Sequence, residues 1–341
     1  MTLAFFSTLA TTVIFIYLCR RTRIAQVLLD FPNARGLHAS PVARVGGVAL
    51  FASVWLFSGL WIQRDLVAAI AGLSVVLVAI SFIDDLRPLP ALLRLLVHAG
   101  MAITIVLIWN EAFGLASNLY GTSASWLLSP VGAFGAVVAI VWMTNLYNFM
   151  DGADGLAGGM SVIGFGAYAI ASASIPNSGG SMSLLAVSIA GASAGFLAFN
   201  FSPAKVFMGD AGSIPLGFLA AALGIHGSLE QLWPWWFGVL VFSPFIVDAS
   251  TTLLRRTAQG NKPWIAHRDH YYQRLILSGW SHRKTALVYY CVMLASGGSA
   301  LVAIADPGWS VILITWVITY ALLLLFAEWH LHQKKNNKIK E

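Results

Sequence analysis

The stretch VAAIAGLSVVLVAISFIDD, residues 67–85, joins an apolar run to a pair of carboxylates. Residues 67–83 carry no charge, and about 20 mainly apolar residues are enough for a helix to cross a bilayer. The run ends at Asp84 and Asp85, which a spanning helix would place at one mouth of the membrane. Charges in that position are costly and are usually retained for function. The stretch therefore predicts a transmembrane helix that ends in a functional site.

The composition extends this pattern to the whole chain. Of its 341 residues, 58% are hydrophobic and only 10% are charged, and its mean hydropathy is +0.77. A soluble domain carries about a quarter charged residues. We therefore predict an all-α, polytopic integral membrane protein in which residues 1–341 form a single membrane domain. The apolar runs predict about eleven transmembrane helices, over residues 2–18, 45–62, 67–83, 91–109, 129–147, 158–175, 183–200, 212–227, 232–249, 285–304 and 309–328.

The distribution of Lys and Arg predicts the orientation, because cytoplasmic loops carry an excess of both. Of the 20 Lys and Arg residues, 19 fall on one side if the N-terminus is outside and the C-terminus cytoplasmic, and only Arg64 does not. The net charge of +6 then reflects topology and contact with anionic lipid headgroups, and not nucleic-acid binding. Besides the C-terminal tail 329–341, the cytoplasmic segments are the loops expected to form the active site: 19–44, 84–94, 145–157, 201–211 and 250–284.

The segment NLYNFMDGADGLAGG, residues 145–159, is the most specific in the chain. Gly152 and Gly155 predict that a helix breaks there, so that the backbone can approach a ligand closely. Hard cations such as Mg²⁺ prefer the oxygen ligands that Asn and Asp supply. The alternative is a capped, glycine-rich turn. Asn and Asp side chains recur at every third position of this segment, which places neighbouring members near one face of a helix: Asn145, Asn148, Asp151 and Asp154.

Other polar groups are predicted at the same membrane face. Repulsion between Asp84 and Asp85 would raise the pKa of one of them unless a cation is near; the alternative is a polar helix end exposed to water. Asp210 begins an apolar run, where it could be a metal ligand or a simple helix cap. The loop 250–284 supplies positive charge suited to a diphosphate, or it serves only as a positive-inside loop. Arg44 adds a basic, glycine-flanked element in the first loop.

Four motifs together resemble those of the polyprenyl-phosphate N-acetylhexosamine-1-phosphate transferases, the glycosyltransferase 4 family. The motifs are Asp84-Asp85 and residues 145–155, 207–210 and 267–270, in order along the chain. The resemblance implies that a sugar 1-phosphate passes from a UDP-N-acetyl sugar to undecaprenyl phosphate, with release of UMP. It also implies a bacterial inner-membrane location and Mg²⁺ as cofactor, with Mn²⁺ as a substitute.

The resemblance further implies roles for individual residues. Asn148 and Asp210 look like metal ligands. Asp84 and Asp85 look like catalytic acids that activate the lipid phosphate or help to hold the metal. Asp151 and Asp154 also look like catalytic residues, which contribute to the nucleotide site or to metal orientation. With Arg44 from the first loop, the predicted substrate-binding residues are Asn145, His267, Arg268 and His270. A carboxylate could act as a base or as a nucleophile, so one-step and two-step mechanisms both stay open.

The chain departs from the peptidoglycan branch of that family. Consecutive histidines in the last motif of that branch are replaced here by His267-Arg268-Asp269-His270, and its basic first-loop motif by His38, Pro41 and Arg44. The chain looks more like the branch that initiates O-antigen and related surface polysaccharides. GlcNAc, GalNAc, FucNAc and QuiNAc all stay open as the sugar, and a homodimer is compatible with the sequence.

The rival interpretation is a cation-coupled secondary transporter, which also places carboxylates in broken helices. Transporters place them near the bilayer midplane, usually in two related halves. Here the acids lie at one mouth and no internal repeat is visible. A structural or lipid-scrambling protein would leave the acid–glycine motifs unexplained.

Overall fold

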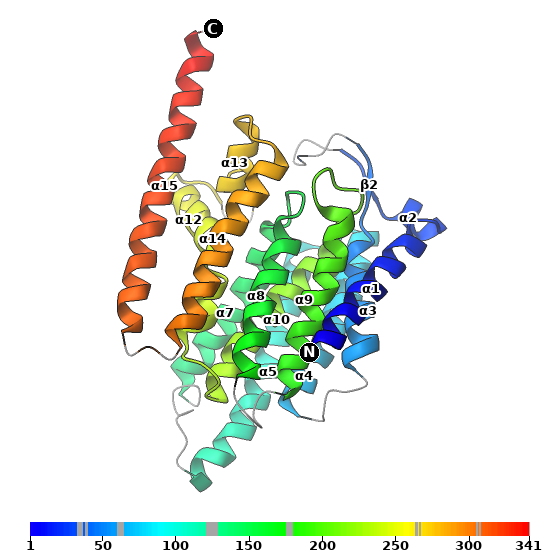
Figure 1. Cartoon of the computed structure of the whole chain (residues 1–341), viewed down its shortest axis with the longest axis vertical. Coiled ribbons are helices and arrows are strands. Elements are labelled where there is room, and N and C mark those ends of the chain that lie inside the picture. The colour runs from blue at the N-terminus through cyan, green and yellow to red at the C-terminus, as the bar shows by residue number, and fades with distance from the viewer. Residues whose placement is uncertain are drawn as a thin grey trace.

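The computed structural model of the chain describes residues 1–32, 37, 40–59, 65–120, 129–174, 180–262, 265, 267–304, 306 and 308–340. Arg64 and His38 lie outside these residues. The described part is helical almost throughout, which confirms the predicted all-α class (Figure 1). Its exception is a short antiparallel ribbon of two strands.

The elements follow one another in a simple order. The first half contains α1 (Thr2–Cys19), α2 (Arg23–Val27), β1 (Leu29–Asp30), β2 (Val42–Ala43), α3 (Gly46–Ser58), α4 (Leu66–Leu86), α5 (Ala91–Tyr120) and α7 (Pro130–Phe149). The second half contains α8 (Leu156–Ala173), α9 (Gly180–Asn200), α10 (Asp210–Leu229), α11 (Trp236–Val241), α12 (Ser243–Ala258), α13 (Tyr271–Leu277), α14 (His282–Ala303) and α15 (Trp309–Lys340).

Nine helices of the described chain are long and apolar enough to cross a membrane: α1, α4, α5, α7, α8, α9, α10, α14 and α15. Each corresponds to one of the predicted spans. The span predicted over 45–62 contains α3, an apolar helix of 13 residues. The polytopic architecture is therefore confirmed.

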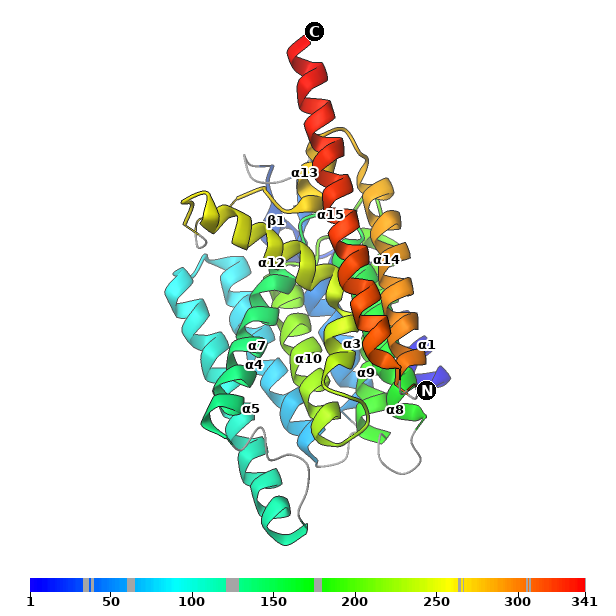
Figure 2. The ribbon, with the colours of Figure 1, turned by 90° about the vertical axis from the view of Figure 1, so that its left-hand side faces the viewer.

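The prediction of one continuous span over 232–249 is wrong. The chain instead forms α11 and α12, with Phe242 between them. Pro244 lies in the first turn of α12. Because proline lacks an N–H and clashes with the carbonyl four residues earlier, it begins a helix well but interrupts a continuing one. As a result α12 takes its own direction, and in Figure 2 it runs obliquely across the neighbouring helices.

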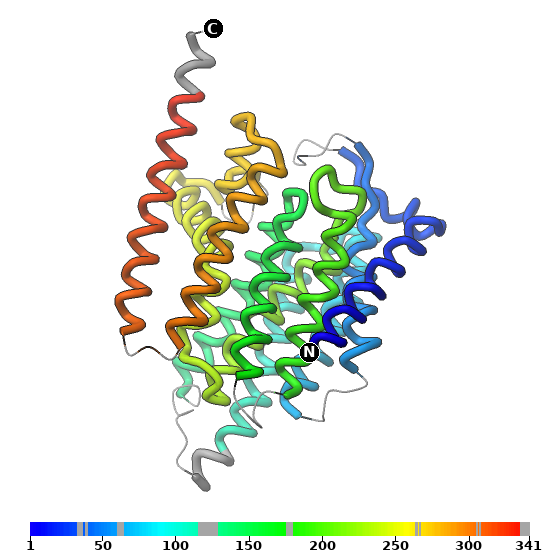
Figure 3. The backbone as a smooth tube through the Cα atoms, viewed as in Figure 1, coloured from blue at the N-terminus to red at the C-terminus, as the bar shows by residue number. Residues whose placement is uncertain are grey.

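The helices α8, α9 and α10 form the buried centre of the bundle. α8 packs on α9, α9 on α1, and α10 on both α4 and α7; α8 and α9 run side by side in Figure 3. Small residues allow these close approaches: a Cβ at Gly217 of α10 would lie 2.6 Å from the carbonyl oxygen of Met143 in α7. The close contact of α7 with α10 aligns the ends that carry Asn148 and Asp210.

The segments predicted to be cytoplasmic gather at one end of the bundle (Figure 1). Pairing of the backbone joins two of them: Ala43 of β2 bridges Val206, and the Phe207 N–H donates to the Ala43 carbonyl over 2.9 Å. The Gly47 N–H donates to the Met208 carbonyl over 2.8 Å. These bonds fix the first loop against the segment that leads into Asp210.

Candidate active site

A cavity of about 230 Å³ opens at this end of the bundle. It is built from the α7–α8 loop, the α9–α10 loop, the ribbon and the starts of α10, α13 and α14. Its polar lining consists of Asp30, Arg44, Asn148, Asp151, Asp154, Asn200, Asp210, Gln273 and His282. Side chains from segments up to 252 residues apart in sequence, from Asp30 to His282, therefore meet in one polar space.

The two adjacent carboxylates at the end of α4 differ in surroundings. Asp85 accepts hydrogen bonds from the backbone N–H groups of Asp210, over 3.1 Å, and Ala211, over 2.9 Å. Its side chain is 1% exposed, and Arg44 lies 3.6 Å away. The first N–H groups of a helix have no intrahelical acceptor, and the helix dipole favours an anion there. Asp85 thus caps α10 from a neighbouring helix.

Asp84 faces α5 instead. It accepts from the Leu89 N–H over 2.5 Å and forms an ion pair with Arg94 over 3.0 Å. The same guanidinium nitrogen of Arg94 lies 3.3 Å from Asp210. Arg94 therefore bridges two of the predicted site carboxylates and partly neutralises both. It is 36% exposed, so its remaining donors are open to an anionic ligand.

Asn148 and Asp210, the two predicted metal ligands, are in direct contact. The Asn148 amide nitrogen donates to Asp210 over 2.8 Å and to the Ser213 hydroxyl over 2.9 Å. Asp210 is the first residue of α10, preceded by Gly209 with φ +73°. That left-handed conformation, which glycine adopts without strain, turns the chain so that Asp85 can reach the start of α10.

Asp151 follows the end of α7 and lines the cavity. Burial, reinforced by the negative charges of Asp210 and Asp85, raises the pKa of Asp151 well above its ordinary value. No hydrogen bond or ion pair reaches its carboxylate from the rest of the described chain. A half-buried carboxylate without a partner costs free energy when it is ionised. A positively charged group bound beside Asp151 would therefore be stabilising.

Asp154 is stabilised as an anion. Its carboxylate accepts from the Ala204 N–H over 3.1 Å and lies 3.3 Å from Nδ1 of His282. Burial alone would raise the pKa of Asp154, but the bonds from His282 and the backbone outweigh burial and lower it. Asp154 thus joins the α7–α8 loop to the start of α14 and to the α9–α10 loop.

The glycine-rich loop has the predicted break. α7 ends at Phe149, α8 begins at Leu156, and Gly155 has φ +77°. The Gly155 N–H donates to Asn200 over 2.8 Å, and its carbonyl accepts from the Tyr290 hydroxyl over 2.6 Å. These bonds fix the backbone that presents Asp151 and Asp154.

Four predicted substrate-binding residues do not line the cavity. Asn145 lies one turn deeper in α7, where it donates to the Val141 carbonyl and bonds to His98. His267, Arg268 and His270 lie in the segment before α13. Burial, helped by the positive charges around it, lowers the pKa of His267 to about 4, so this imidazole is neutral at pH 7.

The structure also brings in residues that the sequence analysis did not single out. Arg94, Gln273 and Asp30 were not predicted, and His282 was known only as part of a basic loop. Gln273 follows His270 by three residues, so the spacing of one helical turn could have indicated it. The bridging position of Arg94, ten residues after Asp84, carries no comparable sequence signal.

The donor set fits the Mg²⁺ that the resemblance implies. Within the described residues, no three His, Cys, Asp or Glu side chains come together as a ready-made metal site. Mg²⁺, however, is usually held by one or two carboxylates, with water and substrate phosphates as the other ligands. Asp210 and Asp151, which has no hydrogen-bond partner for its carboxylate among the described residues, can supply these carboxylates. Asn148 could add its oxygen if its amide turned over.

Comparison with known proteins shows which family the chain belongs to. The glycosyl transferase family 4 model matches residues 67–228. The probable undecaprenyl-phosphate N-acetylglucosaminyl 1-phosphate transferase of Bacillus subtilis is 30% identical over 92% of this chain and 88% of its own. The chain belongs to glycosyl transferase family 4.

Other family members are similar over most of their length. The undecaprenyl-phosphate alpha-N-acetylglucosaminyl 1-phosphate transferase of Salmonella typhi is 28% identical over 92% of this chain and 86% of its own. The decaprenyl-phosphate N-acetylglucosaminephosphotransferase of Mycolicibacterium smegmatis is 28% identical over 86% and 80%. Membership makes the chain a transferase, confirms the predicted resemblance, and gives no support to the transporter interpretation.

Proposed function

We propose that the chain transfers an N-acetylated sugar 1-phosphate from a UDP-sugar to undecaprenyl phosphate. The products are undecaprenyl-diphosphate-sugar and UMP, and the reaction takes place at the cytoplasmic face of a bacterial inner membrane. In this role the chain initiates O-antigen or a related surface polysaccharide. The names of its relatives support a polyprenyl-phosphate acceptor.

One observation carries the proposal. Four carboxylates but one arginine, Arg44, line a cavity at the end of an apolar bundle, and the partly exposed Arg94 contacts one of these carboxylates, Asp210. A diphosphate with a divalent cation complements such a surface, since the cation satisfies the carboxylates and the arginines meet the remaining phosphate charge. A lipid-anchored phosphate reaches the same depth along the helices, so the two substrates meet in a fixed orientation.

The transfer itself is a phosphoryl substitution. A phosphate oxygen of the lipid attacks the phosphorus that bears the sugar, the bond to the UMP oxygen breaks, and UMP leaves. Mg²⁺, when bound, neutralises charge on the diphosphate and on the departing UMP. Arg94 and Arg44 donate to phosphate oxygens. Asp85 holds the first turn of α10, and with it Asp210, in position.

Purified protein in detergent provides the direct test. It is mixed with undecaprenyl phosphate, Mg²⁺ and, separately, UDP-GlcNAc, UDP-GalNAc, UDP-FucNAc and UDP-QuiNAc, and UMP release is measured. We expect release with at least one sugar and only when the lipid phosphate is present. No release with any donor, or equal release without the lipid, would contradict the proposal.

A further inference from the structure

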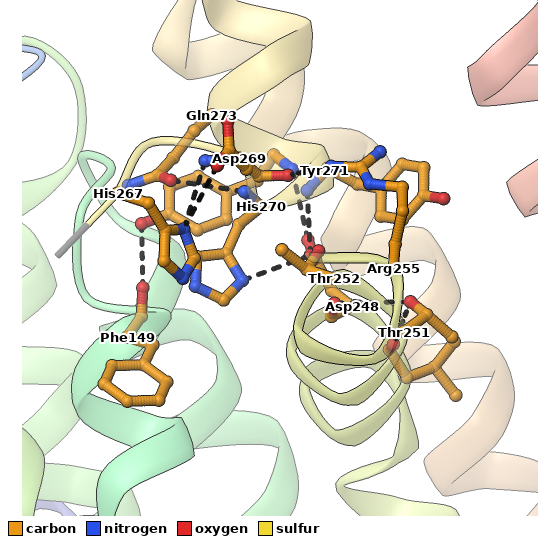
Figure 4. A network of polar contacts seen from close by, with 12 residues as sticks. Phe149, Asp248, Thr251, Thr252, Arg255, His267, Asp269, His270, Tyr271 and Gln273 are labelled. Atoms are coloured by element: carbon orange, nitrogen blue, oxygen red, sulfur yellow. Dashed lines mark hydrogen bonds and ion pairs between the residues drawn. The ribbon is translucent and has the colours of Figure 1, made fainter. Parts of the chain in front are cut away.

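One buried carboxylate belongs to neither the cavity nor the predicted motifs. Asp248 lies in α12, and its side chain is 4% exposed. It accepts hydrogen bonds from the backbone N–H groups of Tyr271, over 2.8 Å, and Tyr272, over 3.1 Å. The Tyr289 hydroxyl of α14 donates to it over 2.5 Å. Figure 4 shows Asp248 beneath the segment that leads into α13.

These bonds give α13 its place. A helix of 7 residues is too short to be stable alone, and its first N–H groups need acceptors from elsewhere. Asp248 accepts from the first two of them. Conversely, a buried carboxylate is tolerated only when donors satisfy it. The start of α13 and Asp248 thus stabilise each other.

The segment held in this way carries two side chains that matter to the site. His270 precedes α13, and its Nδ1 lies 3.6 Å from Asp248, within ion-pair distance but longer than a hydrogen bond. Its ring lies between those of Phe149, with centroids 5.9 Å apart, and Tyr272, 6.0 Å apart. Gln273 lies one turn later, lines the cavity, and accepts from the His270 N–H over 3.3 Å.

A further bond connects α13 to the acidic loop. The Tyr272 hydroxyl donates to the Phe149 carbonyl over 2.9 Å, two residues before Asp151. Phe149 ends α7. The orientation of α13 and the position of the Asp151 loop are therefore coupled through Tyr272, whose own backbone N–H is held by Asp248.

We propose that Asp248 is a positioning residue for the sugar-nucleotide side of the site. It acts through α13, whose orientation places Gln273 at the cavity and His270 beside it. This inference rests on the proposed function. If Asp248 had only a structural role, replacing it would destabilise the whole protein and affect both substrates alike. If it positions α13, replacing it should weaken binding of the UDP-sugar more than binding of undecaprenyl phosphate.

The test compares Asp248→Asn with the wild type in the UMP-release assay. Asparagine keeps the shape but turns a donor toward the α13 N–H groups. We expect the KM for the UDP-sugar to rise between about 10-fold and 100-fold, the scale of a misplaced contact, with the KM for undecaprenyl phosphate nearly unchanged. Hydrogen exchange of peptides covering 267–278 should become faster. Thr251→Val is the matched control, because among the described residues the Thr251 hydroxyl bonds only to the backbone of its own helix.

Several outcomes would overturn the inference. They are a wild-type KM for the UDP-sugar in Asp248→Asn, an equal rise in both KM values, or unchanged exchange of α13. If Asp248→Asn does not fold, Tyr289→Phe, which removes one donor and little volume, gives the same comparison with a smaller rise. Absence of UMP release by the wild type is a separate result, since it is the failure of the proposed function.

Discussion

The carboxylate of Asp85 caps the helix that begins with Asp210. Both Asp85 oxygens are used, one on the N–H of Asp210 and the other on the N–H of Ala211. The acidic pair that ends one helix therefore sets the position of the acid that begins another. The Asp84-Asp85 motif and the motif at 207–210 therefore lie close together because one caps the helix that the other begins, and not only because both are expected to serve the same reaction.

Asp85→Asn should lower kcat at least about 100-fold with a much smaller rise in the KM for the UDP-sugar, since the misplaced Asp210 acts mainly in the transition state. Stability should fall by about 0.5–2 kcal/mol, as for loss of a helix cap. Steady-state UMP release and chemical unfolding in detergent measure the two effects.

Asp65→Ala is the matched control for this substitution, because alanine removes a helix cap that asparagine would keep. Asp65 caps α4 by accepting from the Ala68 N–H over 3.1 Å, at the end of that helix away from the cavity. The substitution should lower the free energy of unfolding by a similar amount but change kcat by less than about twofold. If both variants lost activity equally, loss of stability and not the position of Asp210 would be the cause.

Asp210→Asn should abolish transfer in a protein that still inserts and folds, because a hard-cation ligand is neutralised. EDTA should stop the wild type, and Mg²⁺ or Mn²⁺ should restore it. Binding of Mn²⁺, followed by electron paramagnetic resonance, should weaken in Asp210→Asn. It should stay unchanged in Asp306→Asn, a control at an exposed carboxylate between α14 and α15 that accepts from the Gly308 N–H. Full turnover by metal-stripped wild type would rule out the proposed cofactor.

The ion pair of Asp154 with His282 should influence acid stability. The pKa of Asp154 is lowered in the folded state, so its contribution is present above the unfolded value of about 3.9 and is lost as the pH falls through the lower folded value. In His282→Gln the pKa of Asp154 should be less depressed, because the bond and the charge of His282 are gone, so the loss of stability from this group on acidification should be smaller. Melting temperatures between pH 3 and pH 7 measure the difference. Identical profiles for both proteins would contradict it.

Gly217→Val should separate α7 from α10. The added side chain meets the Met143 carbonyl oxygen, which a Cβ would approach to 2.6 Å, and overpacking of this kind costs about 1–3 kcal/mol or more. Gly166→Val is the control, because no described atom beyond the backbone of its own helix lies within 4 Å of a Cβ there. We expect a lower yield of folded protein and lost activity only for Gly217→Val, by size-exclusion chromatography and UMP release. Equal yields would show that the contact tolerates a larger residue.

The orientation of the bundle is open to a direct topology test. A reporter fused after residue 337 should be cytoplasmic, and one inserted near residue 116 should be external, because 19 of the 20 Lys and Arg residues then lie inside. Alkaline phosphatase and green fluorescent protein fusions distinguish the two compartments. A cytoplasmic reporter at residue 116 would overturn the placement of the site.

Much of the fold could be predicted from the sequence, because a bilayer imposes a simple length rule on apolar helices. The helix break between Asn148 and Leu156 was equally visible, since glycine marks it. The interruption at Phe242 was missed. The apolar run continues through that point, and only the backbone consequence of Pro244 divides it into α11 and α12.

By itself, the sequence determined the membrane class, the motif residues and the end of the bundle where they gather, because these depend on local hydropathy and charge. Tertiary structure alone decided which motif residues meet. It placed Asn145 against α5, put Gln273 and His282 in the cavity, and made Arg94 a bridge between Asp84 and Asp210. Such contacts depend on how helices distant in sequence rotate and pack against one another, and local pattern does not encode that rotation.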